Sequence, residues 1–302
     1  MKTNILTFPA VETRRRVSAV MVSYQTGPAL FEAINAIVTD PDIDELILVD
    51  NGNDIETYRK LRELKERHKE VRVIQGHGNI GFSRGNNLGA SYARGQYLLF
   101  INPDAVLRKG AVRQLVDCGK NLNMPWVAGA MIQLTNGREQ RGGRRNQLTA
   151  QSAFVSFTPL HKSPFFESLH LENNPLPEQP VATPVVSGAC MMMCRDSFNE
   201  LGGFDEDFFL HVEDIDICRR AQDAGGEVYF VPGATAVHYG STSKVRRRTV
   251  EWEKTKGFIK YFRKHSKSRF SRFLVTLASP FIVLMIMGRA WLNAFWHFLL
   301  GR

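Results

Sequence analysis

The chain has 302 residues, of which 43% are hydrophobic and 23% charged. These proportions exclude a disordered chain and fit one large domain with an appendage, or two small domains. Its four cysteines form no CxxC pair, which argues against a zinc site or a disulfide scaffold. The formal net charge is +9, and the excess lies after residue 243, where fourteen Lys and Arg face two acids; a basic tail predicts anionic partners.

The first 16 residues lack the apolar core of a secretory signal, so we expect 1–16 to be an extension and the domain after it to stay in the cytoplasm. Short apolar runs then alternate with amphipathic segments. This alternation predicts an α/β fold with a mostly parallel central sheet flanked by helices. Ligands in such sheets lie beyond the carboxyl ends of the strands. The predicted strands are 17–22, 45–49, 71–74 and 97–101. Of the three predicted helices, the first ends near residue 39, and the other two cover 55–70 and 85–94.

The segment after residue 77, GNIGFSRGNNLG, is rich in Gly and Asn and leads into a predicted helix. Its backbone amides and the helix N-terminus could face a phosphate or a nucleoside. A glycine-rich turn is weak evidence alone. The fingerprint GxGxxG is absent after the first strand, which argues against a nicotinamide enzyme.

A candidate metal site follows the strand 97–101. Asn102, Pro103 and Asp104 come directly after it, and a carboxylate there can bind a divalent cation that bridges two phosphates. Oxygen ligands suit Mg²⁺ or Mn²⁺. The alternative is a Pro-Asp turn that caps the next helix. His238 follows the last predicted core strand and becomes a candidate ligand only beside such an aspartate.

A candidate general base lies in the run HVEDIDICRR, 211–220, which contains Glu213 and Asp214. A carboxylate there would take the proton from an acceptor hydroxyl that attacks an anomeric carbon. The alternative is that these acids only interact with the dipole of the helix they begin.

Two later regions differ in composition. We expect 137–184, rich in Arg, Gln, Pro and Asn, to be a long connection or mobile loop with a little helix. The tail 244–302 has a basic stretch to residue 272 and then the apolar run 273–287, interrupted by Pro280. The run is shorter than the roughly 20 residues of a membrane span. We expect it to lie in an anionic membrane interface; packing on the core, or a longer span, are the alternatives.

The motifs taken in order are VSYQTG, VDNG, GNIGFSRGNNLG, NPDA, VSGACMMM, LGGFDEDFFLHVEDIDICRR and AVHYGS. This series resembles family 2 glycosyltransferases of the GT-A nucleotide-diphospho-sugar transferase fold, and within them the rhamnosyltransferase-like branch that builds bacterial surface polysaccharides. The resemblance covers about 17–243, with 244–302 as a helical, membrane-associating tail. It implies an inverting enzyme at the cytoplasmic face of the inner membrane.

The resemblance also implies substrates and partners. The preferred donor is dTDP-L-rhamnose, with UDP-hexoses open, and the acceptor is a lipid-linked sugar or a glycan. Nucleic acid is not expected as a partner, although basic residues beside aromatics keep a nucleic-acid-binding protein as a rival. A non-catalytic nucleotide-sugar-binding protein is the second rival.

The resemblance further implies roles for matched positions. Asp214 would be the catalytic base, with Glu213 as its neighbour, and Asp104 and His238 would hold Mg²⁺ or Mn²⁺. Asn102 stands where the usual metal motif has Asp, so the site has one charge fewer. Ser187 and Gly188 would shape the acceptor side, and Arg220 could pair with acids or phosphate. The donor-binding positions are Ser23, Asp50, Asn51, Asn79, Gly81, Phe82, Arg84, Asn86, Asn87, Asn102 and Arg220.

Overall fold

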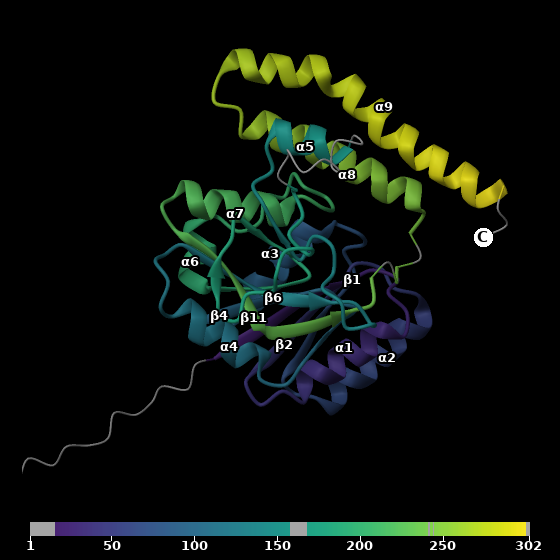
Figure 1. The fold of residues 1–302 in the computed structure, drawn as a ribbon. Helices are drawn as coiled ribbons and strands as arrows, with labels where there is room; N and C mark the ends of the chain where they lie inside the picture. Colours follow the sequence, from purple (N-terminus) through teal and green to yellow (C-terminus); the bar gives the residue numbers. More distant parts are fainter. Residues whose placement is uncertain (1–15, 158–167, 241, 244, 300–302) are drawn as a thin grey trace, which may run out of the picture.

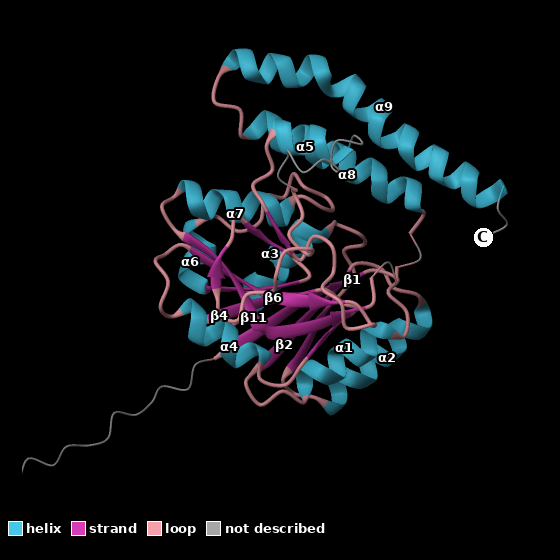
Figure 2. Ribbon diagram, viewed as in Figure 1, coloured by secondary structure: helices cyan, strands magenta, loops and turns pink. Residues whose placement is uncertain are grey.

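The computed structural model of the protein describes residues 16–157, 168–240, 242–243 and 245–299, so the expected extension 1–16 lies almost wholly outside the described residues. The described residues form a central sheet with helices on both faces and two long helices across one side of the molecule (Figure 1, Figure 2). The strands are β1 Val17–Ser23, β2 Glu45–Asp50, β3 Val71–Ile74, β4 Tyr97–Ile101, β5 Ala105–Leu107, β6 Trp126–Gln133, β7 Arg144–Arg145, β8 Val181–Ala182, β9 Val185–Val186, β10 Cys190–Cys194 and β11 Glu227–His238.

The main sheet has the order β3-β2-β1-β4-β10-β6-β11-β5, with β8 paired to β11. Its first four strands are parallel, as are β6 and β11, whereas β10 runs antiparallel to both β4 and β6. The predicted mostly parallel α/β sheet is confirmed, within a mixed sheet. The four predicted strands are present and differ by at most one residue at their ends.

Helices cover both faces because neighbouring residues in each strand point to opposite faces. Ala19 and Met21 belong to one apolar cluster with α1, α2 and α4, while Val20 belongs to a second cluster with α3, α6, α7 and α8. A strand buried on both faces is apolar throughout, which is why these strands could be recognised as short apolar runs. The helices are α1 Ala29–Val38, α2 Ile55–Arg67, α3 Phe82–Tyr92, α4 Ala111–Gly119, α5 Ala150–Phe157, α6 Arg195–Glu200, α7 Glu213–Asp223, α8 Arg247–Lys264 and α9 Arg269–Leu299.

The parallel strands β1, β2 and β4 bring their carboxyl ends to one edge. Ser23 pairs with Asp50 at the ends of β1 and β2, and Met21 pairs with Ile101 at the end of β4. The polar residues that follow these strands in the sequence therefore meet at this edge, where α/β sheets bind their ligands.

Where the structure describes it, the segment 137–184 is the long connection that we predicted, with little regular structure. β7 pairs with β9 in a small second sheet, and α5 supplies the little helix that was predicted. Arg144 is 6% exposed and binds Glu139 through Nε and Nη2 at 2.9 and 3.1 Å. This buried ion pair and the strand pairing hold residues 139–145 against the main body; residues 158–167 lie outside the described part of the chain.

The tail forms two helices that lie along one another, α8 against the domain and α9 outside it (Figure 1). Phe258 and Tyr261 are buried where α8 meets the domain and belong to the second core cluster. The expectation that Pro280 interrupts the apolar run is wrong, because Pro280 lies inside α9, a single helix of 31 residues. A proline inside a helix removes one backbone hydrogen bond, and more than two helical turns on each side keep α9 intact. Its residues Arg269–Gly288 are long and apolar enough to cross a membrane, with a mean hydropathy of 1.9.

Candidate active site

A carboxylate and an imidazole meet where β4 and β11 end. Asp104 follows β4 by three residues, and His238 is the last residue of β11. Nε2 of His238 is 2.9 Å from Oδ1 of Asp104, and the hydroxyl of Thr242 donates to Oδ2 at 3.0 Å. Burial would raise the pKa of Asp104, but the hydrogen bonds and charge of His238, with the Thr242 hydroxyl, outweigh it and lower this pKa. Asp104 is therefore an ionised, largely buried carboxylate.

The chemistry of these groups fits a divalent cation. Nδ1 of His238 lies 2.7 Å from Oε1 of Gln140, a carbonyl oxygen that can only accept, so Nδ1 donates. Nε2 would have to give up its hydrogen bond to Asp104 before its lone pair could bind a metal, and a cation held between the two groups would then replace that bond. The side chain of Asn102 approaches the same nitrogen at 3.3 Å. Among the described residues no three His, Cys, Asp or Glu side chains form a metal cluster, so phosphate and water would complete the coordination.

A second group of side chains lies at the ends of β1 and β2. Oδ1 of Asp50 accepts the backbone N–H groups of Gly52 and Asn53 at 3.0 and 2.9 Å, and the Asn53 side chain at 2.8 Å. Oδ2 of Asp50 accepts from Gln75 at 3.0 Å, and Asn53 also donates to the hydroxyl of Ser23 at 2.7 Å. Asp50 and Ser23 are thus held in fixed orientations at the sheet edge.

The turn before α3 packs against this group. Asn51 donates to the carbonyl of Gly81 at 3.0 Å and is 3.1 Å from the ring of His77, while Asn79 accepts from the N–H of Gly81 at 3.0 Å. Gly81 has φ +86°, and a Cβ there would come within 2.7 Å of the ring of Phe209. Only glycine satisfies both conditions, which explains the Gly in this part of the motif.

Most of the predicted donor-pocket residues in α3 contact the protein itself. Asn86 is buried and donates to the carbonyl of Phe82 at 3.0 Å. Asn87 donates to and accepts from the backbone of Phe204, at 2.8 and 2.9 Å. The side chain of Arg84 is 57% exposed and lies 3.4 Å from an exposed glutamate. The contacts of Asn87 and Arg84 join α3 to the loop before α7.

Two adjacent carboxyl groups begin α7. His211 and Val212, directly before it, have φ of +67° and +75°, a region that side chains with a Cβ rarely occupy. This strained turn directs Glu213 and Asp214 inward, and both are buried. Strain of this kind persists where the surrounding structure enforces it, often at functional sites.

The two carboxyl groups differ in ionisation. Burial would raise the pKa of Asp214, but the adjacent Arg145 guanidinium and the N–H groups of Gly188 and Ile215 outweigh it and lower this pKa. Arg145 lies 2.5 Å from Oδ2 of Asp214, and the N–H of Gly188 is at 3.1 Å. Burial, and then the charge of Asp214, raise the pKa of Glu213, whose Oε2 has no hydrogen-bond partner among the described residues. At neutral pH Asp214 is the ionised member of the pair.

The structure brings Asp214 close to the end of β4. The N–H of Gly188 donates to Asp214, and the carbonyl of the next residue, Ala189, accepts from the N–H of Asn102 at 2.9 Å. The loop between β9 and β10 therefore connects the carboxylate of α7 to the residue that begins the predicted metal motif.

Two residues of this site were missed by sequence reasoning, Gln140 and Arg145. Both lie in the segment that we expected to be a long connection, and they contact His238 and Asp214, respectively. These contacts join residues 98 and 69 positions apart, and the only signal in the sequence was an Arg-rich run.

Arg220 pairs with an acid, as its position suggested. Its Nε donates to Asp216 at 2.8 Å, and its Nη atoms donate to the carbonyls of Leu201 and Gly203 at 2.5 and 2.8 Å. These contacts tie α7 to the loop before it, and all of them lie within the protein.

Two solved structures with similar folds are complexes with nucleotide ligands and Mn²⁺. The mannosyltransferase PcManGT from Pyrobaculum calidifontis, in complex with GDP-Man and Mn²⁺, has a TM-score of 0.58 at 14% identity and covers 92% of this chain and 75% of that one. GalNAc-T7 with UDP, GalNAc and Mn²⁺ also has a TM-score of 0.58, at 19% identity, and this chain spans less than half of it, 44%. These likenesses confirm the GT-A-like fold.

Sequence comparison identifies the family. The N-acetylglucosaminyl-diphospho-decaprenol L-rhamnosyltransferase of Mycobacterium tuberculosis is 25% identical over 244 residues, covering 75% of this chain and 77% of the relative. Rhamnosyltransferase WbbL of Escherichia coli is 23% identical over 252 residues, covering 80% and 85%. The model of glycosyl transferase family 2 matches residues 18–202, more than half of the chain. The protein therefore belongs to glycosyl transferase family 2.

Proposed function

We propose that the enzyme transfers a sugar with inversion from a nucleoside-diphosphate donor to a lipid-linked or glycan acceptor in cell-surface polysaccharide assembly. The preferred donor is dTDP-L-rhamnose, because two relatives that match most of the chain are rhamnosyltransferases. A hexosyltransferase of Haloferax volcanii, 26% identical over 216 residues, keeps UDP-hexoses as the alternative donors.

One observation supports this proposal most strongly. An ionised carboxylate on α7, Asp214, is connected through Gly188 and Ala189 to Asn102, next to the paired Asp104 and His238. A base for the acceptor hydroxyl and a site for the leaving diphosphate would then lie near one another. Inverting transfer requires this, because the nucleophile and the leaving group lie on opposite sides of one anomeric carbon.

Asp214 is the better base of the two acids in the motif. A base has to be ionised before it can take a proton, and the lowered pKa of Asp214 meets this condition while the raised pKa of Glu213 does not. Asp214 Oδ2 is occupied by Arg145 and Gly188. Its Oδ1 accepts the N–H of Ile215 at 2.8 Å and retains a second lone pair, which would receive the acceptor proton.

Asp104 and His238 would hold Mg²⁺ or Mn²⁺, with Asn102 beside them, and the bound ion would neutralise charge on the leaving diphosphate. Both structural neighbours named above contain Mn²⁺. Ser23, Asp50 and Asn51 would bind the base and ribose, and the turn at Asn79 and Gly81 would face the diphosphate through backbone amides. The guanidinium of Arg84 is partly exposed and would also face the diphosphate. Phe82, Asn86, Asn87 and Arg220 would shape this pocket by holding its walls.

We place the enzyme at the cytoplasmic face of a membrane. The mycobacterial relative is named for a diphospho-decaprenol acceptor, and the exposed apolar helix α9 follows the domain here. A lipid-linked acceptor would be presented at that surface.

A donor screen tests the proposal. The release of nucleoside diphosphate from dTDP-L-rhamnose, UDP-hexoses and GDP-mannose is measured with membrane extract as acceptor and Mn²⁺ present. We expect release with dTDP-L-rhamnose that Asp214→Asn lowers by about 100-fold to 10,000-fold, while donor affinity stays near that of the wild type.

The matched control is Asp223→Asn, at the exposed end of the same helix, which should keep full turnover. Wild-type turnover in the Asp214→Asn protein would refute the assignment of the base. Release from none of the nucleotide sugars would refute the function.

A further inference from the structure

An apolar stripe runs along the outer side of α9. Its members recur at helical spacing and are 46 to 72% exposed, so they lie on one face of the helix. The opposite side of α9 packs inward, where Ile286 is 5% exposed and joins the second core cluster. We call these residues the α9 stripe: Phe270, Phe273, Leu274, Leu277, Phe281 and Leu284.

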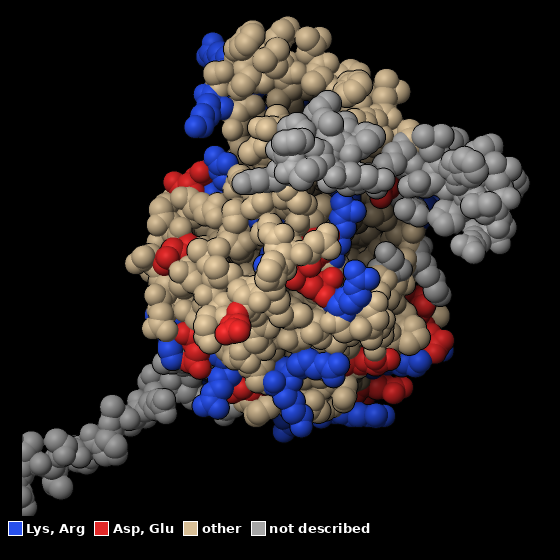
Figure 3. Space-filling model, in the orientation of Figure 1, with Lys and Arg blue, Asp and Glu red and all other residues tan. Residues whose placement is uncertain are grey.

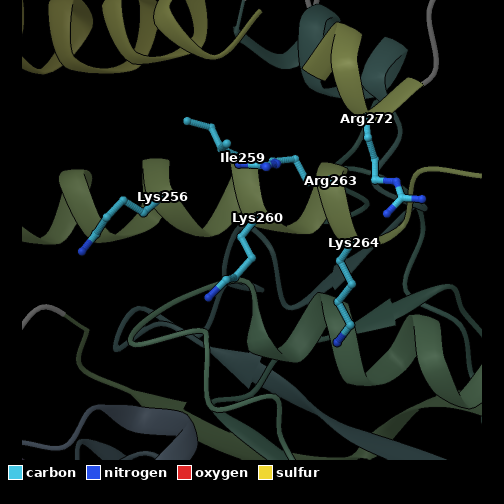
Figure 4. A pocket seen from close by; sticks show the side chains of 6 residues that line it. All are labelled: Lys256, Ile259, Lys260, Arg263, Lys264 and Arg272. Atoms are coloured by element: carbon cyan, nitrogen blue, oxygen red, sulfur yellow. The ribbon is translucent and has the colours of Figure 1, made fainter. Parts of the chain in front are cut away.

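A basic cleft of about 480 Å³ lies where α8 turns into α9. Figure 4 shows its lining: three lysines along α8, Arg263 and Ile259 beside them, and Arg272 from α9. In Figure 3 basic side chains gather at this end of the two helices, and the outer surface over α9 is free of charge. The three lysines are Lys256, Lys260 and Lys264.

The cations of the cleft differ in their partners. Each of the three lysines forms an ion pair with an acid, at 2.6 to 3.0 Å. Arg263 and Arg272 form no ion pair with any residue that the structure describes. These two guanidinium groups are therefore available for a ligand, and guanidinium is suited to phosphate.

We propose that α8 and α9 form a membrane-binding face that lies along an anionic leaflet: the α9 stripe enters the acyl region, and Arg263 and Arg272 bind lipid phosphates in the basic cleft. This proposal concerns binding to the bilayer alone and does not require the sugar-transfer chemistry. It settles the orientation of α9, which its length and composition leave open between spanning and lying on the surface.

The packing of α8 excludes a spanning orientation. α9 lies along α8, and α8 is attached to the domain through Phe258 and Tyr261, which belong to the second core cluster and are each at most 7% exposed. If α9 crossed the bilayer in this arrangement, the lysines of α8 and part of the domain would enter hydrocarbon, where charged groups are costly. With both helices parallel to the surface, the stripe enters the leaflet and the cations stay at headgroup depth.

The charge beside the stripe favours a membrane over a second copy of the chain. Because α9 contains no Asp or Glu, a second copy packed stripe to stripe would bring no acid to Arg263 and Arg272. An anionic leaflet instead satisfies the stripe and the cleft together. Lipid phosphates can also move to fit the arginines, whereas a protein partner would have to match their spacing.

Flotation of the full chain with vesicles tests this proposal. We expect binding to vesicles of phosphatidylcholine with phosphatidylglycerol, and weaker binding to phosphatidylcholine alone. The pair Leu277→Glu and Phe281→Glu should lower binding to both by more than about 100-fold. The pair Arg263→Gln and Arg272→Gln should lower binding to the anionic vesicles by about 30-fold and leave binding to phosphatidylcholine alone unchanged.

The controls are matched changes on α2, far from α9 (Figure 1). Ile55→Glu replaces a residue that is 65% exposed, and Arg59→Gln with Arg62→Gln removes two exposed cations; both should float like the wild type. All of the changed positions on α9 are exposed, and thermal unfolding confirms that each variant folds.

Three results would overturn the proposal. The stripe variant could float as well as the wild type. The wild type could be a dimer without lipid that the stripe variant splits, or it could bind DNA through the same arginines and not bind vesicles.

Orientation is tested separately, in inside-out membrane vesicles from expressing bacteria, with an epitope appended after Arg302. External protease should remove the epitope together with the domain, and protection of the epitope would mean that α9 spans. Because no sugar donor is present in any of these measurements, their failure is distinct from a failure of the proposed function.

Discussion

Asp216 joins the helix of the proposed base to the tail, and its replacement by Asn should destabilise the protein strongly. Its carboxylate is fully buried. It accepts from Nε of Arg220 at 2.8 Å on its own helix, and from Lys264 and His265 of the α8 end at 2.8 and 2.9 Å. Asn keeps the shape of the side chain but removes its charge and turns an NH₂ group toward these donors.

The magnitude follows from the ionisation of Asp216. Burial would raise its pKa, but His265, Arg220 and Lys264 outweigh it and lower the pKa from 3.8 to about 2. That difference corresponds to about 2.5 kcal/mol in favour of the charged form. Lys264 keeps its ion pair with Asp205 and Arg220 keeps its two carbonyl contacts, so the lost charge sets the size of the effect. We therefore expect Asp216→Asn to lower the free energy of unfolding by about 2 to 3 kcal/mol.

The effect should depend on pH in a defined direction. The pKa of Asp216 is lower in the folded protein, so its contribution is fully present above the ordinary value of 3.8 and is lost as the pH falls through about 2. The difference in unfolding free energy between wild type and Asp216→Asn should therefore be constant from neutral pH to about pH 4.5 and shrink below it.

Urea unfolding followed by tryptophan fluorescence measures these free energies. The control is Asp223→Asn, on the same helix, which loses a more exposed ion pair with Arg219 and should cost less than about 1 kcal/mol. If Asp216→Asn costs no more than this control, the buried carboxylate does not hold α8 on α7, and the reasoning fails.

Three further changes test the site. Arg145→Gln removes the cation that lowers the pKa of Asp214, so the acidic limb of the pH–rate profile should move to higher pH; an unchanged limb would separate Arg145 from the base. His238→Ala should weaken Mn²⁺ binding by about 10-fold to 100-fold, measured by paramagnetic resonance of free Mn²⁺ with donor present, and equal affinity would exclude the histidine as a ligand. Gly81→Ala places a Cβ within 2.7 Å of Phe209 at φ +86°, so urea unfolding should show a loss of about 3 kcal/mol, and a smaller loss than about 1 kcal/mol would mean that the turn adapts.

The elements that could be predicted are those that a short stretch of the sequence determines by itself. The strands β1, β2 and β4 are buried on both faces, so each is a short apolar run that stands out between charged segments. Parallel pairing then places the ends of these strands at one edge, and the residues after them could be recognised as a candidate site from their order alone.

The contact between Arg145 and Asp214 could not be predicted from the residues around either of them. Nothing near Arg145 distinguishes it from the other arginines of a Gly-rich segment, and its partner is 69 positions away. Only the pairing of β7 with β9 brings it there. The expectation for Pro280 failed for a different reason. It rested on the general rule that proline interrupts a helix, but the long apolar turns on both sides of Pro280 outweigh one lost hydrogen bond.

The two functions proposed for the molecule meet on α7. Asp214 and Asp216 are two positions apart, which places their side chains about 200° apart around the helix, so one carboxylate faces the site and the other holds α8. The height of Asp214 above a membrane bound to α9 is therefore set by contacts within the protein. Weakening the Asp216 contacts should lower transfer to a membrane-bound acceptor more than transfer of the same sugar to water. Only transfer to the membrane-bound acceptor requires a fixed height of Asp214 above the leaflet.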